Sequence, residues 1–489
     1  MAKEFNVVLV VPNLRWIDSD INALWHYVPY NLCILGAMIE PLCRVSIIDA
    51  YKHDMSPELF SAKIRESRPD VVGLTILMDQ YAEAGHQAAR LVKAAVPGAK
   101  VILGGVYATM NPLKAAEDVN VDYVMVGEGE YAFRDLILHF KGERDLPEKG
   151  LCFRRDGKLV NSGRAEFIKD LDALPLPAYH LIDFLSYANA ADRKSVDAPP
   201  CFPYARLLTS RGCPYGCVFC QVESIMGKKF RSRSAENVLS EIRYLKGTYG
   251  VRSLMFDDDN LFTDKARAKA IFRGMIEQGL SMPWLAMSVA VFRLDEEMLV
   301  LMKQSGCEYI NIAIESGSKR VLTEIVHKPV DYDHAKEMVR LAKREGLYVA
   351  ANFIVGFPTE TWDEIRTTVR FAEELGIDYM KLFAAIPLEN TRLWDLCVKE
   401  GAFKKNFSES GRHWSSGQIE TKDFSSADLT FLRAYEWDRV NFSDPEKRRK
   451  TAARMKITEE ELLRIRRGTL DNAKNRVYLD QKGKLENNT

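Results

Sequence analysis

The sequence predicts an α/β protein with two successive regions of alternating strand and helix, followed by a helical C-terminal region. From residue 5 to about 140, short and nearly continuous apolar runs alternate with amphipathic stretches, which is typical of strands buried on both faces of a parallel sheet. From about 201 to 400 six such runs recur, each followed by polar residues, which is typical of a barrel or partial barrel. We therefore expect a doubly wound, Rossmann-like domain over residues 1–142, a connector over 143–200, a (β/α)6 TIM-type domain over 201–400 and a helical region over 401–489.

Composition places the chain among globular proteins with large cores. It has 489 residues, of which 47% are hydrophobic, enough for two or three domains. The 68 basic residues balance the 68 acidic ones, so no overall field attracts nucleic acid. Nine scattered cysteines, a first segment without the pattern of a signal peptide, and no apolar run near the ~18 residues of a membrane span predict a reducing, cytoplasmic location without a transmembrane segment.

The first region contains five predicted strands, at residues 7–11, 45–49, 71–76, 101–103 and 123–126. Sheets of this type bind ligands beyond the carboxyl ends of their strands. Two glycine loops follow the last two strands, one with Gly104 and Gly105 and one with Gly127 and Gly129. Glycine lets the backbone approach a ligand closely, but it is also ordinary punctuation between a strand and a helix, so neither loop alone identifies a ligand.

The connector is predicted to contain a hairpin and an extended linker. The run from Arg154 to Lys158 is a hairpin-turn signal between two short apolar runs. The alternating leucines and prolines from Leu174 to Pro177 favour extended backbone.

The second region contains six predicted strands, at residues 205–209, 253–256, 284–288, 309–314, 349–355 and 379–383. In a barrel of this kind the functional site lies at the carboxyl ends of the strands. Beyond residue 401 the pattern is charged and helical, and Thr458 with Glu461 predicts a capping box at the start of a helix.

Three cysteines after the first strand of the second region carry the strongest chemical signal. Cys213, Cys217 and Cys220 form a C-x3-C-x2-C loop, which supplies three thiolates and no fourth. A structural zinc site needs four protein ligands, and the sequence has no second pair to complete one. A redox dithiol leaves the third cysteine unexplained. An iron-sulfur cubane held by three thiolates has one iron open to a substrate or cofactor.

At this loop the chain resembles the radical S-adenosylmethionine (SAM) superfamily, whose signature is this spacing with an aromatic residue, here Phe219, before the last cysteine. The resemblance implies a partial barrel, a 4Fe-4S cluster on the three cysteines and SAM at the open iron. It also implies that the reduced cluster cleaves SAM to methionine and a 5'-deoxyadenosyl radical.

The two glycine loops, together with the strands and helix around them and their place before the cysteine loop, resemble the cobalamin-binding domain of cobalamin-dependent radical SAM enzymes. The residues that this resemblance assigns to cobalamin are Thr75, Gly104, Gly105, Tyr107, Gly127, Glu128 and Gly129. Tyr107 stands where many relatives have histidine, and the Asp-x-His-x-x-Gly motif that supplies a cobalt ligand is absent. Cobalamin is therefore expected to bind without a protein histidine below the cobalt.

Polar residues after the barrel strands are the candidates for SAM. Asp257 or Asp258 is expected to receive the methionine amino group, although the same Asp-Asp-Asp-Asn run also suits a helix cap. Glu315 is expected to accept hydrogen bonds from the ribose, with capping by its serine neighbours as the alternative. The remaining candidates are the Gly356-Phe357 turn, for the adenine, and Ser288 and Arg293, for further polar contacts.

The resemblance implies a radical SAM C-methyltransferase, similar to the enzymes that methylate tetrapyrrole and bacteriochlorophyll side chains, hopanoids and antibiotic scaffolds. A small-molecule biosynthetic intermediate is the expected substrate, with a tetrapyrrole slightly favoured, and a flavodoxin or ferredoxin is the expected electron donor. Two alternatives stay open: a radical SAM oxidative cyclase, hydroxylase or dehydratase, and a cluster or cobalamin carrier without catalysis.

Overall fold

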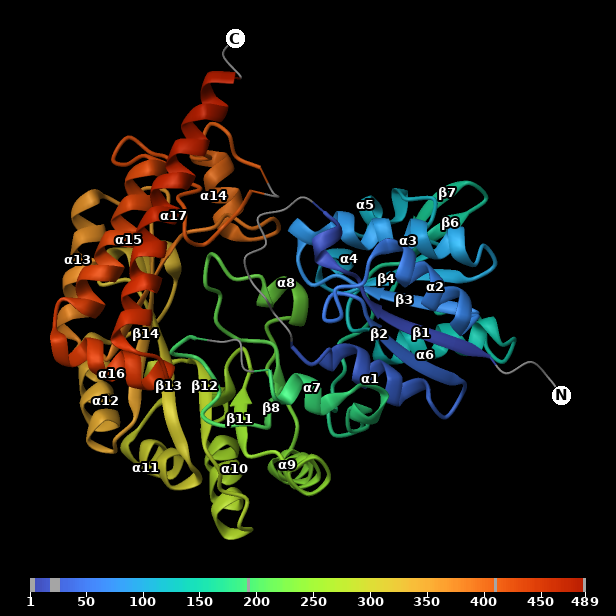
Figure 1. The fold of residues 1–489 in the computed structure, drawn as a ribbon, viewed down its shortest axis with the longest axis horizontal. Coiled ribbons are helices and arrows are strands. Elements are labelled where there is room, and N and C mark those ends of the chain that lie inside the picture. Colours follow the sequence, from blue (N-terminus) through green and yellow to red (C-terminus); the bar gives the residue numbers. More distant parts are fainter. Residues whose placement is uncertain (1–4, 18–26, 191–193, 409–410, 487–489) are drawn as a thin grey trace. The chain divides into compact units, whose positions relative to one another are not determined.

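The computed structural model describes residues 5–17, 27–190, 194–408 and 411–486. The chain forms two compact units, Met1–Ala190 and Ala191–Thr489. Figure 1 shows a sheet with helices in each unit. The prediction about the first segment falls in part on residues 1–4, outside the described residues. Within the described residues, no helix is long and apolar enough to cross a membrane.

The first unit contains a seven-stranded sheet in the order β2-β1-β3-β4-β5-β6-β7. Five of its strands are parallel and match the predicted ones to within one or two residues: β1 (Asn6–Val11), β2 (Arg44–Asp49), β3 (Val71–Thr75), β4 (Lys100–Gly104) and β5 (Tyr123–Met125). The strand order reverses between β1 and β3, which is the position where doubly wound sheets bind ligands.

The predicted hairpin is present, but it belongs to this sheet. Its strands β6 (Leu151–Arg155) and β7 (Lys158–Asn161) are antiparallel, and β6 pairs with β5. Residues that the sequence assigned to a connector therefore extend the first sheet, because an unpaired β5 edge offers backbone groups to the next segment of the chain.

Helices cover both faces of the first sheet. Alternate residues of β1 enter two different cores: Val7 and Leu9 pack with one set of helices, and Val8 and Val10 with the other. One face carries α1 (Tyr30–Ile39) and α6 (Gly129–Phe140), and the other carries α2 (Pro57–Ser67), α3 (Ala82–Ala95), α4 (Val106–Met110) and α5 (Pro112–Glu117). The short helices of this unit are η1 (Leu14–Trp16), η2 (Asp79–Tyr81), η3 (Tyr179–Leu181) and α7 (Phe184–Ala188). The near-continuous apolar strands of the sequence are thus buried on both sides.

The second unit contains a six-stranded parallel sheet in the order β15-β14-β13-β12-β11-β8. Its strands follow one another in chain order, as in the wall of a partial barrel. They are β8 (Tyr204–Leu207), β11 (Ser253–Phe256), β12 (Trp284–Val289), β13 (Cys307–Glu315), β14 (Tyr348–Val355) and β15 (Tyr379–Ala384). The helices between and after them are α9 (Ala235–Tyr249), α10 (Lys265–Glu277), α11 (Glu296–Ser305), α12 (Tyr332–Arg344), α13 (Trp362–Glu374) and α14 (Arg392–Glu400), with short turns η4 (Leu261–Thr263), η5 (Val291–Arg293) and η6 (Val321–Val326).

The C-terminal region is helical as predicted, and it covers the last strand of the barrel wall. It consists of α15 (Ser426–Phe442), α16 (Pro445–Met455) and α17 (Glu459–Glu486). Asn441 of α15 bonds to both backbone groups of Met380 in β15, and Arg433 donates from Nε to the carbonyl oxygen of Leu382. These side chains satisfy the outer edge of β15, which otherwise offers unpaired backbone groups to a foreign strand.

Candidate active site

The cysteine loop leaves β8 and returns to α9 through a short clasp. Strands β9 (Ser210–Arg211) and β10 (Arg231–Ser232) pair antiparallel at its base, and α8 (Val222–Met226) lies within it. Gly212 has a φ of +81°, and a side chain there would meet the carbonyl oxygen of Lys229. The glycine before the first cysteine is therefore required for the tight entry into the loop.

Two other segments fix the middle of the loop. The amide of Val218 donates to the carbonyl oxygen of Val326 at 3.1 Å, and the carbonyl oxygen of Val218 accepts from the amide of Leu393 at 2.9 Å. The backbone between the second and third cysteines is thus held by the turn after β13 and by α14, which limits how far the thiols can move.

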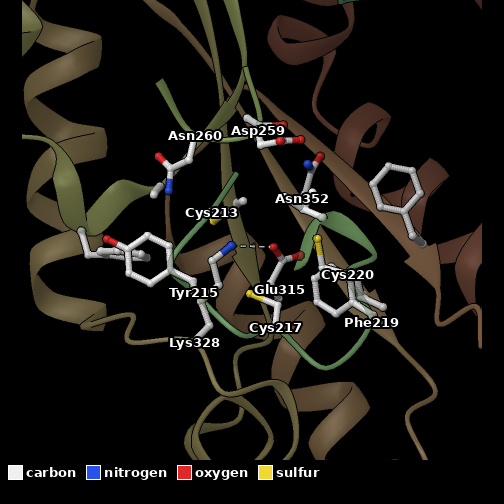
Figure 2. Close-up of a pocket in the computed structure, with 17 residues that line it drawn as sticks. Cys213, Tyr215, Cys217, Phe219, Cys220, Asp259, Asn260, Glu315, Lys328 and Asn352 are labelled. Atoms are coloured by element: carbon white, nitrogen blue, oxygen red, sulfur yellow. Dashed lines mark hydrogen bonds and ion pairs between the residues drawn. The ribbon is translucent and has the colours of Figure 1, made fainter. Parts of the chain in front are cut away.

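All three cysteines line one cavity of about 260 Å³ at the carboxyl ends of the barrel strands (Figure 2). They are free thiols. Burial raises the pKa of Cys217 to about 11 and that of Cys220 to about 12. Both are therefore protonated at neutral pH in the absence of a metal, which disfavours a thiolate nucleophile or redox dithiol, whereas coordination to iron removes the proton.

The placement of the thiols fits a cluster better than a single ion. Among the described residues, no three His, Cys, Asp or Glu side chains approach closely enough to hold one metal ion. A 4Fe-4S cubane distributes its thiolate ligands over different irons, so its cysteines do not converge on one point. Three separate thiols around one cavity therefore fit the ligand arrangement of a cubane.

A buried ion pair forms another part of the cavity wall. Nζ of Lys328 lies 2.6 Å from Oε1 of Glu315, and the two side chains are 8% and 6% exposed. Burial is the largest single influence on the pKa of the Lys328 ammonium and lowers it, but the charges of Glu315 and Cys217 and the hydrogen bond to Glu315 together raise it above its ordinary value. Glu315 has a φ of +76°, an uncommon conformation for a residue with a side chain. Glu315, predicted from the sequence, is thus in the cavity, and Lys328 is a cation that the sequence analysis did not single out.

Only the second half of the acidic run after β11 lines the cavity. Asp259 and Asn260 line the cavity, while Asp257 and Asp258, the predicted pair, do not. Asp258 is buried and accepts hydrogen bonds from the amide and hydroxyl of Thr209, and Asp257 pairs with Arg206. These two carboxylates hold the exit of β8 in place, since each has a partner on that segment.

The two residues that replace them have features of ligand-binding groups. Burial, and next the charge of Asp258, raise the pKa of Asp259 to about 6. Oδ1 of Asn260 is buried and has no hydrogen-bond partner among the described residues. A buried acceptor without a donor is rare in folded proteins and calls for a ligand or water.

The other predicted SAM residues divide between the cavity and its supports. Phe219 and Ser288 line the cavity. Arg293 does not, but its Nε donates to the hydroxyl of Tyr215, which does. Gly356 and Phe357 also lie outside the lining; their amides donate to Oε2 of Glu360 at 2.6 and 3.0 Å. Burial raises the pKa of the Glu360 carboxyl to about 8.

In the first unit, the carboxyl edge of the sheet is formed largely by backbone. Gly105 has a φ of +97°, and a side chain there would overlap the carbonyl oxygen of Ile76. The amide of Tyr107, two residues further on, donates to the same oxygen at 3.2 Å. The amide of Gly127 donates to the hydroxyl of Thr109 at 3.1 Å. The β4 and β5 loops thus bring bare backbone to the edge where a ligand is expected.

The predicted side chains at this edge are tied within the protein. Tyr107 is 2% exposed, and its hydroxyl lies 3.1 Å from Nε2 of His86, whose Nδ1 lies 2.9 Å from Asp118. Asn31 donates to the hydroxyl of Thr75 at 2.8 Å. The other predicted residues are Glu128, which accepts from the amide of Ile168, Gly104 at the end of β4, and Gly129 at the start of α6.

Two sequence families match the chain. The radical SAM superfamily matches residues 207–372, and the B12 binding domain matches residues 22–137. The first range contains the cysteine loop and the strands β11 to β14. The second contains β2 to β5 and the Gly104-Gly105 and Gly127-Gly129 loops.

Several proteins are similar to this one in sequence over about three quarters of the chain. An uncharacterized methyltransferase of Pyrococcus horikoshii is 32% identical over 76% of this chain and 78% of its own length. The cytidylyl-2-hydroxyethylphosphonate methyltransferase of Streptomyces wedmorensis is 30% identical over 76% and 75%. The anaerobic magnesium-protoporphyrin IX monomethyl ester cyclase of Cereibacter sphaeroides is 26% identical over 75% and 59%.

Solved structures share the fold at lower identity. The radical SAM methyltransferase TsrM of Kitasatospora setae, with cobalamin and a 4Fe-4S cluster bound, is 17% identical with a TM-score of 0.67, over 91% of this chain and 86% of that one. The cobalamin-dependent SAM radical enzyme OxsB, with aqua-cobalamin and SAM bound, is also 17% identical, with a TM-score of 0.71 over 94% and 71%.

Proposed function

The chain belongs to the cobalamin-binding radical SAM family of enzymes, whose cofactors are a 4Fe-4S cluster, SAM and cobalamin, and from this premise we propose that it is a C-methyltransferase for a small-molecule substrate. The observation that carries the proposal is the relative from Pyrococcus horikoshii, a methyltransferase by name, which is alike over both units. The methyltransferase from Streptomyces wedmorensis supports it independently.

We assign the cluster to Cys213, Cys217 and Cys220. Their thiols lie on one cavity and are held by the β9–β10 clasp and the contacts of Val218. When bound, the cofactors supply one-electron cleavage of SAM and a transferable methyl group; the protein binds and orients them and excludes water.

We assign the polar groups of SAM to residues of the same cavity. Asp259 and Asn260 offer acceptors for the methionine ammonium, in place of Asp257 and Asp258. Glu315 offers an acceptor for the ribose, and Lys328 a buried cation for the methionine carboxylate. In this arrangement the methionine carboxylate supplies a second negative charge to Lys328, while Glu315 receives a neutral hydroxyl donor.

Supports behind the cavity orient these groups. Glu360 holds the Gly356-Phe357 turn by two amides, and that turn is the proposed place of the adenine. Phe219 contributes an apolar wall, Ser288 a polar one, and Arg293 orients Tyr215.

Cobalamin is assigned to the carboxyl edge of the first sheet. Gly104, Gly105, Gly127 and Gly129 supply backbone there, and Thr75, Tyr107 and Glu128 brace these loops from within through the bonds described above. Both nitrogens of His86 have partners, so this imidazole is engaged in the fold and is not offered to cobalt.

The most specific part of the proposal is the chemical class of the substrate. A tetrapyrrole is the substrate favoured from the sequence, and the 26% identical relative that is named for magnesium-protoporphyrin supports it. The relative named for a cytidylyl phosphonate is 30% identical, so nucleotide-linked phosphonates belong in the same substrate screen.

Anaerobic reconstitution followed by product analysis tests the reaction. Methyl transfer predicts 5'-deoxyadenosine together with S-adenosylhomocysteine. The cyclase name of the Cereibacter sphaeroides relative favours a second candidate, a radical oxidation without methyl transfer, which predicts 5'-deoxyadenosine alone. If neither 5'-deoxyadenosine nor S-adenosylhomocysteine forms, the protein is a carrier and both enzymatic proposals are overturned.

A further inference from the structure

Trp414 is a partly exposed tryptophan next to the cysteine-lined cavity. It is 42% exposed, and its ring meets that of Phe383, which lines the cavity, edge to face with the centroids 5.5 Å apart. Its indole N–H has no hydrogen-bond partner among the described residues, whereas those of Trp284 and Trp437 donate to hydroxyl groups. A tryptophan usually buries its ring and pairs its N–H, so the exposed part of Trp414 is open to a ligand.

The loop that carries Trp414 is fastened to the barrel wall and to α15. The carbonyl oxygen of Trp414 accepts a hydrogen bond at 3.0 Å from the amide of Ala384, the last residue of β15. Three residues further on, the amide of Gly417 donates at 3.0 Å to the hydroxyl of Thr430 in α15. The ring of His413 stacks on the indole at 5.1 Å. Because the loop is already ordered, a ligand that binds at Trp414 does not have to immobilise it.

A buried cation lies over the same indole ring. The guanidinium carbon of Arg433 is 4.5 Å from the ring centroid of Trp414, and Arg433 is 6% exposed. Its Nε donates to the carbonyl oxygen of Leu382, but its two terminal nitrogens have no hydrogen-bond or carboxylate partner among the described residues. Burial lowers the pKa of this guanidinium to about 10, so it still carries its charge at neutral pH. Buried arginines are nearly always paired, so this one calls for an anion from outside the chain.

Another arginine of the same helix shows the usual arrangement. Arg439, six residues after Arg433 in α15, pairs through Nε with Glu436 and through Nη1 with Glu373, each at 2.7 Å. Arg433 instead has a second cation, Arg476 of α17, near enough to lower the pKa of its guanidinium further. A neighbouring cation makes the charge of Arg433 less favourable, and an anionic ligand reverses that effect.

We propose that Arg433 and Trp414 bind an anionic substituent of the substrate, a carboxylate or a phosphonate, and that Phe383 joins this subsite to the cavity. A guanidinium matches the geometry of both anions, and the indole N–H adds one donor. The inference rests on the proposed function, whose two substrate classes carry such a group. Both residues lie beyond residue 372, where the match to the radical SAM superfamily ends, so the subsite belongs to the C-terminal part of this chain.

Binding of two probe pairs to the full-length, cluster-loaded protein tests this inference. Mesoporphyrin IX and its dimethyl ester are titrated by porphyrin fluorescence, and cytidine 5'-monophosphate and cytidine are measured by equilibrium dialysis. We expect at least one anionic probe to bind more tightly than its uncharged counterpart. A preference in the porphyrin pair identifies a carboxylate as the anion, and one in the cytidine pair identifies a phosphorus oxyanion.

Substitutions then locate the anion. Arg433→Met is expected to raise the Kd for that anionic probe about tenfold to a hundredfold, which is the range for a hydrogen bond to a charged group. Trp414→Phe keeps an aromatic ring at an exposed position and removes only the N–H, so we expect a rise of about two- to tenfold. The Kd values for the uncharged probe and for SAM are expected to stay unchanged in both variants.

Arg439→Met is the matched control, because it removes the same charge from the same helix at a residue whose partners are within the protein. This variant is expected to bind every probe as the wild type does. Melting temperature and cluster absorbance show that each variant is folded.

Two results would overturn the proposal. One is a wild type that binds neither anionic probe more tightly than its uncharged counterpart, a measurement that needs no variant. The other is an unchanged Kd for the anionic probe in folded Arg433→Met and Trp414→Phe. Because these measurements require no turnover, a failure of methyl transfer leaves them intact, and the two proposals can be lost separately.

Discussion

The carboxyl ends of the two parallel sheets are built differently. In the first unit the edge presents backbone, while Thr75 and Tyr107 bond to other side chains of the same unit. In the second unit the cavity is lined by side chains, among them the three cysteines, Glu315 and Lys328. The difference teaches that a side-chain substitution acts directly on ligands in the second unit and through loop geometry in the first.

The largest expected effect is at the cluster. Cys217→Ala leaves two thiols on the loop, so we expect complete loss of cluster absorbance and of SAM cleavage. Absorbance and iron content after anaerobic reconstitution measure this. Cys201→Ala is the control, because Cys201 is a partly buried free thiol of the same unit that does not line the cavity. Cluster retention in Cys217→Ala would remove the basis of the assignment.

The next effect concerns the buried ion pair. Lys328→Met leaves Glu315 buried without its cation, and breaking such a pair costs about 3 kcal/mol of the free energy of unfolding. The double variant Glu315→Gln/Lys328→Met removes both charges and is expected to recover most of that loss in a denaturant titration. Equal stability of Lys328→Met and the wild type would show that the pair is not desolvated.

The third-largest effect is expected from replacing a glycine of the ligand-binding edge in the first unit. Gly105→Ala places a side chain against the Ile76 carbonyl at a φ of +97°, which costs roughly 1–3 kcal/mol or displaces the loop. We expect cobalamin affinity, measured by absorbance titration, to fall about tenfold or more. Gly98→Ala is the control, because a side chain at Gly98 would contact nothing within 4 Å.

The smallest effect sharpens the comparison. Tyr107→Phe removes the hydroxyl that bonds to His86, and we expect a loss of about 1 kcal/mol in the free energy of unfolding. Because Tyr107 is buried, cobalamin affinity is expected to stay within about twofold of the wild type. A large loss of affinity at unchanged stability would instead make Tyr107 a direct contact.

Much of the fold could be predicted from local patterns. The five parallel strands of the first sheet and the six of the second were predicted to within a few residues, because apolar runs of strand length between polar turns are visible in the chain. The capping box of Thr458 and Glu461 is present, since it depends on two residues three positions apart. The pairing of β6 with β5 was missed, because a hairpin signal does not say which sheet the hairpin joins.

The site could be predicted in part. Cys213, Cys217, Cys220 and Glu315 line one cavity, as the sequence predicted. In the acidic run after β11, however, Asp257 or Asp258 was predicted to bind SAM, whereas Asp259 and Asn260 are the residues that line the cavity. The direction of each side chain after β11 depends on the turn that the chain makes there, and on the partners that Thr209 and Arg206 offer to Asp258 and Asp257. A sequence pattern does not contain that turn.

The sequence by itself determined the three-thiol loop, its aromatic neighbour and the strands that carry the site, because covalent spacing and strand periodicity are properties of adjacent residues. Only the tertiary structure decided which polar groups meet. Lys328 reaches Glu315 across thirteen positions of chain. Lys381, the register partner of Asn352, is held by Asp197, and no donor among the described residues reaches the buried Oδ1 of Asn352. These relations arise from packing between distant segments, where burial makes each polar group depend on whichever partner the fold brings to it.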